Sequence, residues 1–267
     1  MADERIIKRC SEGRNGNLIL SPTEGFWSNC PTVEVNPEVS AYEFFDDFMF
    51  SNIGDVTSQW MLDNTNGTVA AGSGATYGLG GMAIFNTGAT DEDWVNLKGW
   101  DADGAGGPFK ITANNGKKLW FESRFYLTAV GAVEVVAFYV GLMDGLTTEP
   151  MADATGERNM VDGLYFRTLS DASTELDFAT TRNSTETEVK AAINTLVKGT
   201  FVRVGFYFDG ANTVQAFING VATSTVVNVS ATTFPYDVGL CPYVGIKTTE
   251  AVNKIAVVDW VKCIQMR

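Results

Sequence analysis

Apolar and polar residues alternate along much of the chain, in short runs rich in valine, phenylalanine, tyrosine, threonine and isoleucine. Clusters of glycine, asparagine, aspartate and serine separate these runs. A period of two places successive side chains on opposite faces of a strand, and no regular alternation of strands with helices is seen. The pattern therefore predicts an all-β sandwich or barrel. The expected strands cover residues 42–50, 119–127, 133–142, 163–169, 201–208, 213–218, 221–229 and 253–266.

Three of these strands predict a meander near the C-terminal end. A turn beginning at Asp209-Gly210 separates the first two strands, and Asn219-Gly220 opens the third. Asn-Gly tolerates positive φ at both central positions of a two-residue turn, so it is a strong hairpin signal. In the first strand, alternation predicts one face toward the core and one outward. The core face is Val202, Val204, Phe206 and Phe208, and the outer face is Arg203, Gly205 and Tyr207.

One segment shows helical rather than strand periodicity. Thr185 and Glu188 have the spacing of a capping box, and Gly199 stands where a helix commonly ends in a left-handed residue. Apolar residues recur between them at helical spacing. The pattern predicts one short helix over residues 186–198, packed over a sheet edge or an end of the sandwich.

The sequence predicts an N-terminal arm with a first strand, residues 1–40, followed by one sandwich domain, residues 41–267. The arm has three prolines and little periodicity, and its first 14 residues hold four basic and three acidic side chains. The acidic excess lies in the rest of the chain. Arg5, Lys8, Arg9 and Arg14 are therefore expected to mark an arm that docks on a partner, with a mobile terminus as the alternative.

Residues 52–116 are dense in glycine, which predicts long loops and bulged strands. A glycine-rich segment raises the question of phosphate binding. No G-x-x-x-x-G-K-[ST] motif occurs in the chain, and the stretch that begins Gly78-Leu79-Gly80 does not complete G-x-G-x-x-G. No phosphate site is expected in this segment.

The composition excludes several classes of function. The 267 residues include no histidine, which removes Ser-His-Asp and Cys-His triads and histidine-ligated zinc. With 19 basic and 32 acidic residues, the net charge of −13 disfavours binding to nucleic acid. No signal-peptide core or membrane-spanning run is found, so a protein made and kept in the cytoplasm is expected.

The four cysteines lie far apart and form no C-x-x-C pair, so free thiols are expected. Pairing of Cys10 with Cys30, or of cysteines near the two termini, is the alternative. The two cysteines nearest the C-terminus are Cys241 and Cys263.

Several stretches resemble the concanavalin A-like lectin/glucanase superfamily as it occurs in phage structural proteins. They are residues 196–210 (LVKGTFVRVGFYFDG), 214–221 (VQAFINGV), 255–262 (IAVVDWVK), 42–49 (YEFFDDFM) and 120–125 (WFESRF). The resemblance implies a jelly roll of two antiparallel sheets in which the N- and C-terminal strands lie close together.

The enzymes of this superfamily require residues that are incomplete here. Retaining glucanases carry an E-x-D-x-x-E strand motif, but the sequence that begins Glu175-Leu176-Asp177 has Thr180 at the last position. Many lyases on this fold use a histidine. A mechanism based on tyrosine alone stays open, and we consider four tyrosines for it. They are Tyr126, Tyr139, Tyr165 and Tyr207.

Sugar binding by lectins of this superfamily often depends on a metal pair whose ligands include histidine. Asp101 and Asp103 offer two oxygen ligands for calcium, yet Ala105 breaks the EF-hand spacing. Metal-independent binding needs exposed aromatic platforms beside polar groups. Trp94 and Trp100, near Asp101 and Asp103, are the candidates.

Taken together, the residues and the resemblance predict a non-enzymatic structural protein of a phage virion, assembled in the host cytoplasm. We expect it to decorate or stabilise the capsid by docking on the head lattice. The expected partners are the major capsid protein or other virion proteins, and a closed homo-oligomer such as a trimer suits capsid symmetry. No cofactor and no metal are expected. The alternative is a lectin-like carbohydrate-binding module, ahead of a degenerate hydrolase or lyase.

Overall fold

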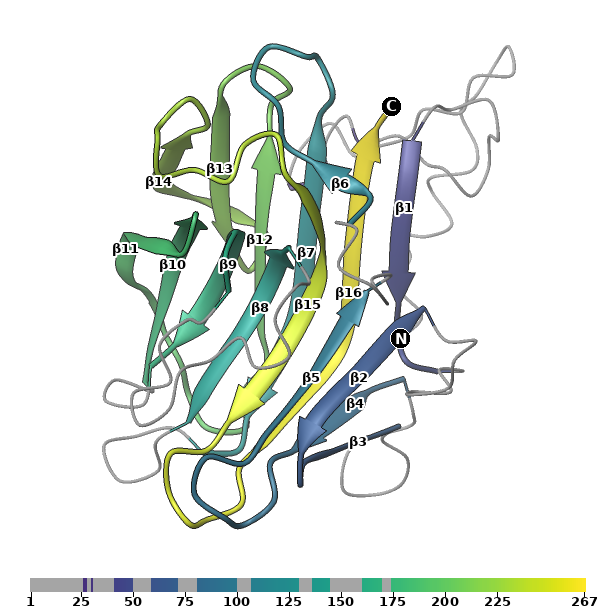
Figure 1. Cartoon of the computed structure of the whole chain (residues 1–267), viewed down its shortest axis with the longest axis vertical. Helices are drawn as coiled ribbons and strands as arrows, with labels where there is room; N and C mark the ends of the chain where they lie inside the picture. Colours follow the sequence, from purple (N-terminus) through teal and green to yellow (C-terminus); the bar gives the residue numbers. More distant parts are fainter. Residues whose placement is uncertain are drawn as a thin grey trace.

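A computed structural model shows a sandwich of two β-sheets (Figure 1). The structure describes residues 26–27, 30, 41–49, 59–71, 81–99, 107–129, 136–144, 160–169 and 174–267. The strands are β1 (Ala41–Asp46), β2 (Trp60–Thr65), β3 (Thr68–Ala71), β4 (Ala83–Asn86), β5 (Trp94–Gly99), β6 (Phe109–Lys110), β7 (Leu119–Leu127), β8 (Ala137–Met143), β9 (Gly163–Thr168), β10 (Glu175–Arg182), β11 (Thr185–Thr195), β12 (Val202–Phe208), β13 (Thr213–Ile218), β14 (Val221–Asn228), β15 (Gly239–Lys247) and β16 (Ile255–Met266).

Each of the two sheets has eight strands, and every strand pair is antiparallel. Sheet A has the order β14-β13-β12-β7-β16-β4-β3, and β1 also pairs with β16. Sheet B has the order β11-β10-β9-β8-β15-β5-β2, and β6 also pairs with β15. Because β1 lies beside β16 over its whole length, the expected closeness of the first and last strands is confirmed.

The main core fills the space between the sheets and is made of alternate residues of the strands. In β12 the four residues predicted to face the core are all buried in it, which confirms the strand prediction there. The β12-β13-β14 meander is also confirmed. Asn219 and Gly220 have φ values of 52° and 77° in its second turn, as a two-residue turn with positive φ requires.

The helix predicted over residues 186–198 is wrong, because the segment is β11, paired with β10. Asn183 and Ser184 have φ values of 49° and 60°, so they form a tight two-residue turn directly before β11. The chain reverses there, and no helix begins at Thr185. Two successive register shifts between Glu188 and Asn194 add residues to β11 and disturb its period of two, and Ala192 within them has a φ of 46°. This disturbance explains why the apolar residues of the segment show a helix-like spacing.

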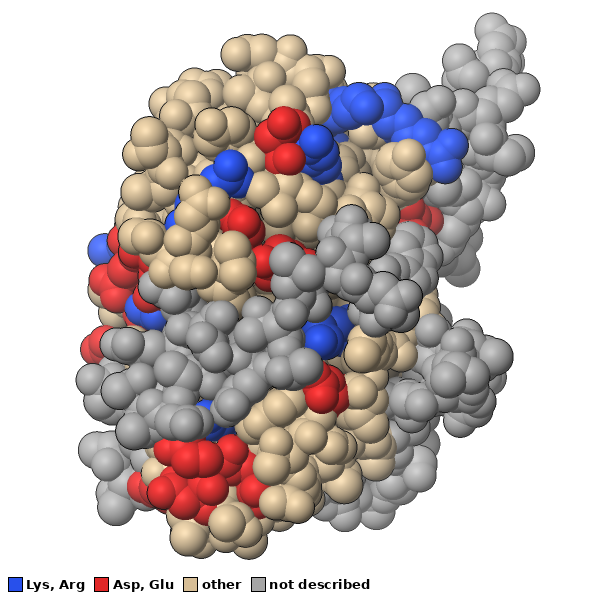
Figure 2. Space-filling model, viewed as in Figure 1, with Lys and Arg blue, Asp and Glu red and all other residues tan. Residues whose placement is uncertain are grey.

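The glycine-rich stretch 52–116, predicted as loops and bulged strands, contains β2 to β6 among its described residues. Most of the predicted arm lies outside the described residues, including Arg5, Lys8, Arg9 and Arg14. In the described part of the chain, no helix is long and apolar enough to span a bilayer. Figure 2 shows acidic side chains gathered at the lower end of the view, where the β4–β5 and β15–β16 connections lie in Figure 1.

Candidate functional site

A row of polar side chains crosses the outer face of sheet B. The strand registers pair Asp63 with Asn96, Asn96 with Gly245, and Gly245 with Tyr139. They continue from Tyr139 to Arg167 and from Arg167 to Asp177, so the row runs from β2 to β10. The intervening residues of these strands point into the main core. We call these residues the polar row; they are Asp63, Asn96, Tyr139, Arg167 and Asp177.

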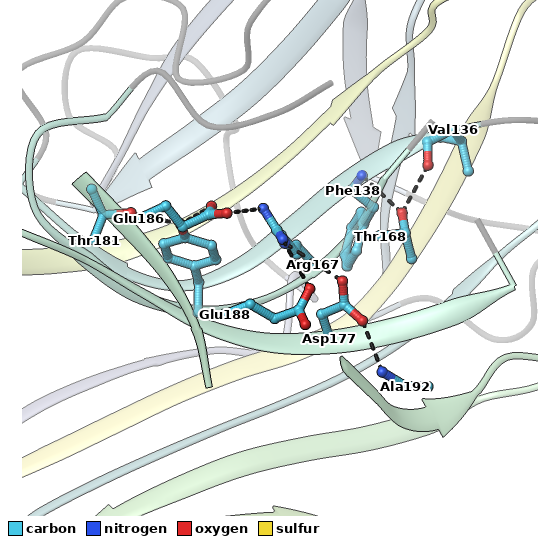
Figure 3. Close-up of polar contacts among 10 residues, drawn as sticks. Val136, Phe138, Arg167, Thr168, Asp177, Thr181, Glu186, Glu188 and Ala192 are labelled. Atoms are coloured by element: carbon cyan, nitrogen blue, oxygen red, sulfur yellow. Dashed lines mark hydrogen bonds and ion pairs between the residues drawn. The ribbon is translucent and has the colours of Figure 1, made fainter. Parts of the chain in front are cut away.

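Arg167 is the centre of the best-defined part of the row (Figure 3). Its guanidinium forms a close ion pair with Glu186 through Nη1, and Nη2 lies 3.6 Å from Glu188 Oε2. Its Nε lies 3.7 Å from Asp177 Oδ2. The Arg167 side chain is only 4% exposed, so three carboxylates from β10 and β11 surround one buried cation. The other oxygen of Asp177 accepts a 2.9 Å hydrogen bond from the backbone N–H of Ala192.

Tyrosine hydroxyls extend this network. The Tyr165 hydroxyl donates to Glu186 Oε2 at 2.6 Å and lies 2.7 Å from Thr181 Oγ1. The Tyr165 ring packs beside that of Tyr139, with 5.2 Å between centroids. Burial raises the pKa of Tyr165 well above its usual value, and the nearby Glu186 carboxylate raises it further. Burial raises the pKa of Tyr243 in the same way. Both phenols therefore stay protonated at neutral pH and can donate hydrogen bonds but cannot accept a proton.

Two glycines allow close packing here, one against the backbone of the neighbouring strand and one against a tyrosine ring. A Cβ atom on Gly141 would lie 2.6 Å from the Cα of Tyr165 and would also collide with the Leu164 carbonyl. A Cβ atom on Gly245 would collide with the Tyr243 ring. The outer face of sheet B therefore packs as a second, smaller core around tyrosines, separate from the main core. This core contains Ala137, Tyr139, Met143, Met160, Tyr165, Ala179 and Tyr243.

Buried lysines at the β5 and β15 end of this face also lie beside carboxylates. Lys98 Nζ is 3.5 Å from Asp63 Oδ2, and its side chain is 4% exposed. Lys247 Nζ is 2.8 Å from Glu92 Oε2, and its side chain is fully buried. In each pair the carboxylate offsets part of the free-energy cost of removing the lysine ammonium group from water.

Comparisons with known proteins place this architecture. No protein-family model matches the sequence, and no curated protein matches it. Among solved structures, peanut lectin gives a TM-score of 0.57 at 13% identity over 85% of this chain and 97% of the lectin. A protein of unknown function from Shewanella oneidensis gives 0.57 at 12% identity, covering 86% and 89% of the two chains. SCLam, a non-specific endo-β-1,3(4)-glucanase, gives 0.52 at 12% identity, covering 85% and 92%.

The fold is a concanavalin A-like jelly roll. The expectation of this fold is therefore confirmed, and at these identities the likeness concerns the fold alone. In the structure, as in the sequence, the glucanase motif that begins at Glu175 and Asp177 lacks its second glutamate. Thr180, at the position of the missing glutamate, is buried and lies 3.2 Å from the Thr233 carbonyl oxygen.

The outer face of the other sheet in this concanavalin A-like fold carries a second polar group that the sequence did not point out. Glu122 of β7 is 2% exposed, accepts a 2.6 Å hydrogen bond from the Trp27 indole N–H and lies 3.2 Å from Arg203 Nε. Burial raises the pKa of Glu122 from 4.5 to about 7, although Arg203 and Trp27 favour its ionised form. Phe26 packs against Phe217, 4.8 Å between centroids, so the Phe26–Trp27 turn covers this part of sheet A.

The structure separates the four tyrosines considered for catalysis. Tyr139 and Tyr165 share the outer face of sheet B, whereas Tyr126 and Tyr207 belong to β7 and β12 of sheet A. Tyr207 packs against Trp120 there, 5.2 Å between ring centroids. The four side chains therefore do not form one site.

The predicted sugar platform is corrected at one of its two tryptophans. Trp94 lies in β5 and is 6% exposed, so its ring does not offer the open surface that stacking on a sugar needs. Trp100, Asp101 and Asp103 lie outside the described residues, and the calcium alternative lies there with them. In the part of the chain that the structure describes, no three acidic or cysteine side chains are grouped as a metal site requires. Cys263 is a buried thiol.

Proposed function

We propose that the protein is a non-enzymatic structural component of a virion, a decoration protein that docks on the head lattice. The observation that carries this proposal is the engagement of carboxylates on the outer face of sheet B. Arg167 holds Asp177, Glu186 and Glu188 in ion pairs. A glycoside hydrolase needs one carboxyl group to protonate the leaving group and a second to attack or activate water. Carboxylates tied to a buried guanidinium are poorly placed for either task, which supports a role without catalysis.

The tyrosines support the same conclusion. A lyase that works through tyrosine alone needs a phenol that accepts a proton from the substrate. Burial raises the pKa values of Tyr165 and Tyr207, two of the four tyrosines considered, and it therefore opposes formation of their phenolates. The phage context rests on the sequence resemblance to superfamily domains of phage structural proteins. The proposed partners are the major capsid protein or other virion proteins.

Co-sedimentation with capsids that lack this protein tests the proposal. We expect the chain to sediment with the particles and to saturate them at a fixed ratio to the capsid subunit. Failure of a folded sample to bind at low and physiological salt contradicts the proposal.

The contribution of the arm is tested by replacing its four basic residues with glutamine. We expect this variant to bind the capsid more weakly than a control in which four basic residues outside the arm are replaced. Equal binding by the two variants removes the arm from the docking surface. The arm residues are Arg5, Lys8, Arg9 and Arg14, and the control residues are Lys117, Lys190, Lys198 and Arg267, all exposed.

A carbohydrate-binding role is the second candidate, and the likeness of the fold to that of peanut lectin supports it. The candidate platform is Trp100 with Asp101 and Asp103, because Trp94, Asn96, Tyr139 and Arg167 are all buried. Affinity electrophoresis on a panel of soluble polysaccharides tests this role. Retardation by one polysaccharide, weakened in Trp100→Ala but not in Ser224→Ala on the exposed β14, favours sugar binding. If no polysaccharide in the panel retards the protein, sugar binding is excluded for the polysaccharides used.

A further inference from the structure

Three ion pairs lie on the outer face of sheet A, where β12, β7 and β16 run side by side (Figure 1). In each pair the side chain of the cation is more exposed than that of the carboxylate. The exposed fractions are 41% against 24%, 39% against 2% and 27% against 15%. The positive member of each pair therefore faces the solvent. In the same order, the pairs are Arg124–Asp259, Arg203–Glu122 and Lys262–Glu43.

The ion pairs of sheet B show the reverse order. Each buried cation on its outer face lies beside carboxylates that are more exposed than itself; these cations are Lys98, Arg167 and Lys247. Lys254 is likewise more buried than Glu250 in the β15–β16 connection. Among the described residues of sheet B, Arg182 and Asp162 form the one pair with the more exposed cation. The two outer faces therefore differ in the sign of the charge that they present.

Aromatic rings lie among the cations of sheet A. The Arg124 guanidinium lies over the Phe201 ring, 4.0 Å from its centroid, and Tyr126 meets the same ring edge to face at 4.8 Å. The strand register places Trp260 opposite Arg124. The three aromatic side chains are partly exposed. Arginine and aromatic residues are enriched at the centres of protein interfaces. We call this surface the cationic face; it consists of Arg124, Tyr126, Phe201, Arg203, Trp260 and Lys262.

A bulge in β16 sets this arrangement. The register shifts between Val258 and Trp260, so Asp259 is an extra residue opposite β7. Asp259 and Trp260 are both partly exposed, whereas Val258 and Val261 on either side belong to the main core. Two successive side chains therefore reach the outer face. Arg124 is held by Asp259 and by the ring beneath it, so a partner that contacts it restricts little further motion.

The predicted arm joins the molecule beside the cationic face. Residues 1–25, which contain its four basic side chains, precede the Phe26–Trp27 turn. The indole N–H of this turn donates to Glu122, which stands two residues before Arg124 on the same side of β7. The Trp27 ring also lies 5.3 Å from Lys262 Nζ. A partner bound by the base of the arm therefore lies next to the cationic face.

We infer that the cationic face docks on the particle and that it meets an acidic patch of the capsid subunit. The inference rests on the proposed function, from which it takes the partner. The basic residues of the arm and the exposed cations of the face both favour an acidic partner. The carboxylates of sheet B lie beyond a spacing of about 10 Å between the sheets. At physiological salt the screening length is about 8 Å, so they repel such a partner only weakly. The chain therefore docks with sheet A toward the particle.

Titration of capsids that lack this protein, followed by co-sedimentation, tests the inference. Arg124→Glu is expected to weaken binding by about tenfold or more, because it turns a like charge toward an acidic patch. Lys190→Glu is its control, since Lys190 is exposed on β11 of sheet B and the change in charge is the same. Trp260→Ala is expected to weaken binding by about tenfold without a change in charge. Tyr236→Ala, which removes an exposed ring before β15, is its control. Both controls are expected to bind like the wild type.

The folding of each variant is checked by circular dichroism and by its melting temperature. If Arg124→Glu does not fold, Arg124→Gln takes its place. A wild type that binds, with both variants binding as tightly as their controls, overturns the inference and leaves the proposed function standing. A folded wild type that does not bind overturns both. Self-association of the wild type that Arg124→Glu abolishes assigns the face to a second copy and overturns the inference as well.

Discussion

At the scale of single residues, Arg167 is expected to stabilise the sandwich more than other arginines do. Replacing it by methionine leaves Asp177, Glu186 and Glu188 crowded without their shared cation. Breaking a buried ion pair from one side costs about 3–5 kcal/mol. We therefore expect Arg167→Met to lower the free energy of unfolding by an amount in this range, measured by urea denaturation.

Arg124 provides the control for this prediction. It forms a close ion pair with Asp259, but its side chain is 41% exposed. Exposed pairs contribute roughly 0–1 kcal/mol because water and salt screen them. Arg124→Met should therefore cost much less than Arg167→Met. Equal losses in the two variants would show that the network around Arg167 has no special role in stability.

Glu122 predicts a dependence of stability on pH. Its pKa is raised from 4.5 to about 7, so the folded state keeps the proton over a range in which the unfolded state has lost it. The free energy of unfolding therefore falls as the pH rises from about 4.5 to about 7. Over this pH range the ionisation of Glu122 lowers the free energy of unfolding by on the order of 3 kcal/mol.

Glu122→Gln removes this ionisation and keeps an oxygen that can accept the Trp27 hydrogen bond. We expect the variant to be more stable than the wild type at pH 8 and to approach it near pH 5. Urea titrations across this range measure the difference between the two proteins. A constant difference at all pH values would mean that Glu122 does not titrate there.

At the scale of elements, two hairpin turns of the same kind carry different residues at their second position. Ser184 has a φ of 60° between β10 and β11, and Gly220 has a φ of 77° between β13 and β14. A left-handed conformation costs a residue with a Cβ roughly 1 kcal/mol, whereas glycine adopts it readily. We therefore expect Ser184→Gly to stabilise the protein by about 0.5–1 kcal/mol and Gly220→Ser to destabilise it. Thermal unfolding of both variants measures this; a loss of stability in Ser184→Gly argues against the turn.

Local patterns in the sequence predicted the strands with the clearest alternation and missed several others, among them β2, β5 and β10. The strand over residues 119–127 and the meander were predicted because their alternation is unbroken and Asn219-Gly220 marks a turn. β11 was predicted as a helix because its bulge disturbs the period of two, and Asn183-Ser184 is a weaker turn signal than Asn-Gly. β15 was not predicted, although it lies between β8 and β5 in sheet B. It contains Pro242, which weakens a strand signal.

The polar row could not be read from the sequence, because it depends on the register between strands far apart in the chain. Arg167 lies in a predicted strand, but nothing local indicates that Glu186 will face it. That contact needs β11 to be a strand beside β10, where a helix was predicted. Glu122 also lies in a predicted strand, but its burial could not be predicted, because it depends on the distant Phe26–Trp27 turn.

At the scale of the whole molecule, the sandwich has a polar but closed outer face on sheet B and a covered area on sheet A. Buried tyrosines and ion pairs fill the outer face of sheet B. These properties fit a protein that acts through its surfaces, in agreement with the proposed place in a virion.

Counting the copies of this chain in purified virions by quantitative mass spectrometry tests that place. The proposal calls for virions of a phage whose genome contains this coding sequence, with the capsid subunit as the internal standard. We predict many copies per particle, in a fixed ratio to the capsid subunit, which survive a high-salt wash. Absence of the chain from the particles, while it is abundant in the soluble fraction of the same lysate, would contradict a structural role in the virion.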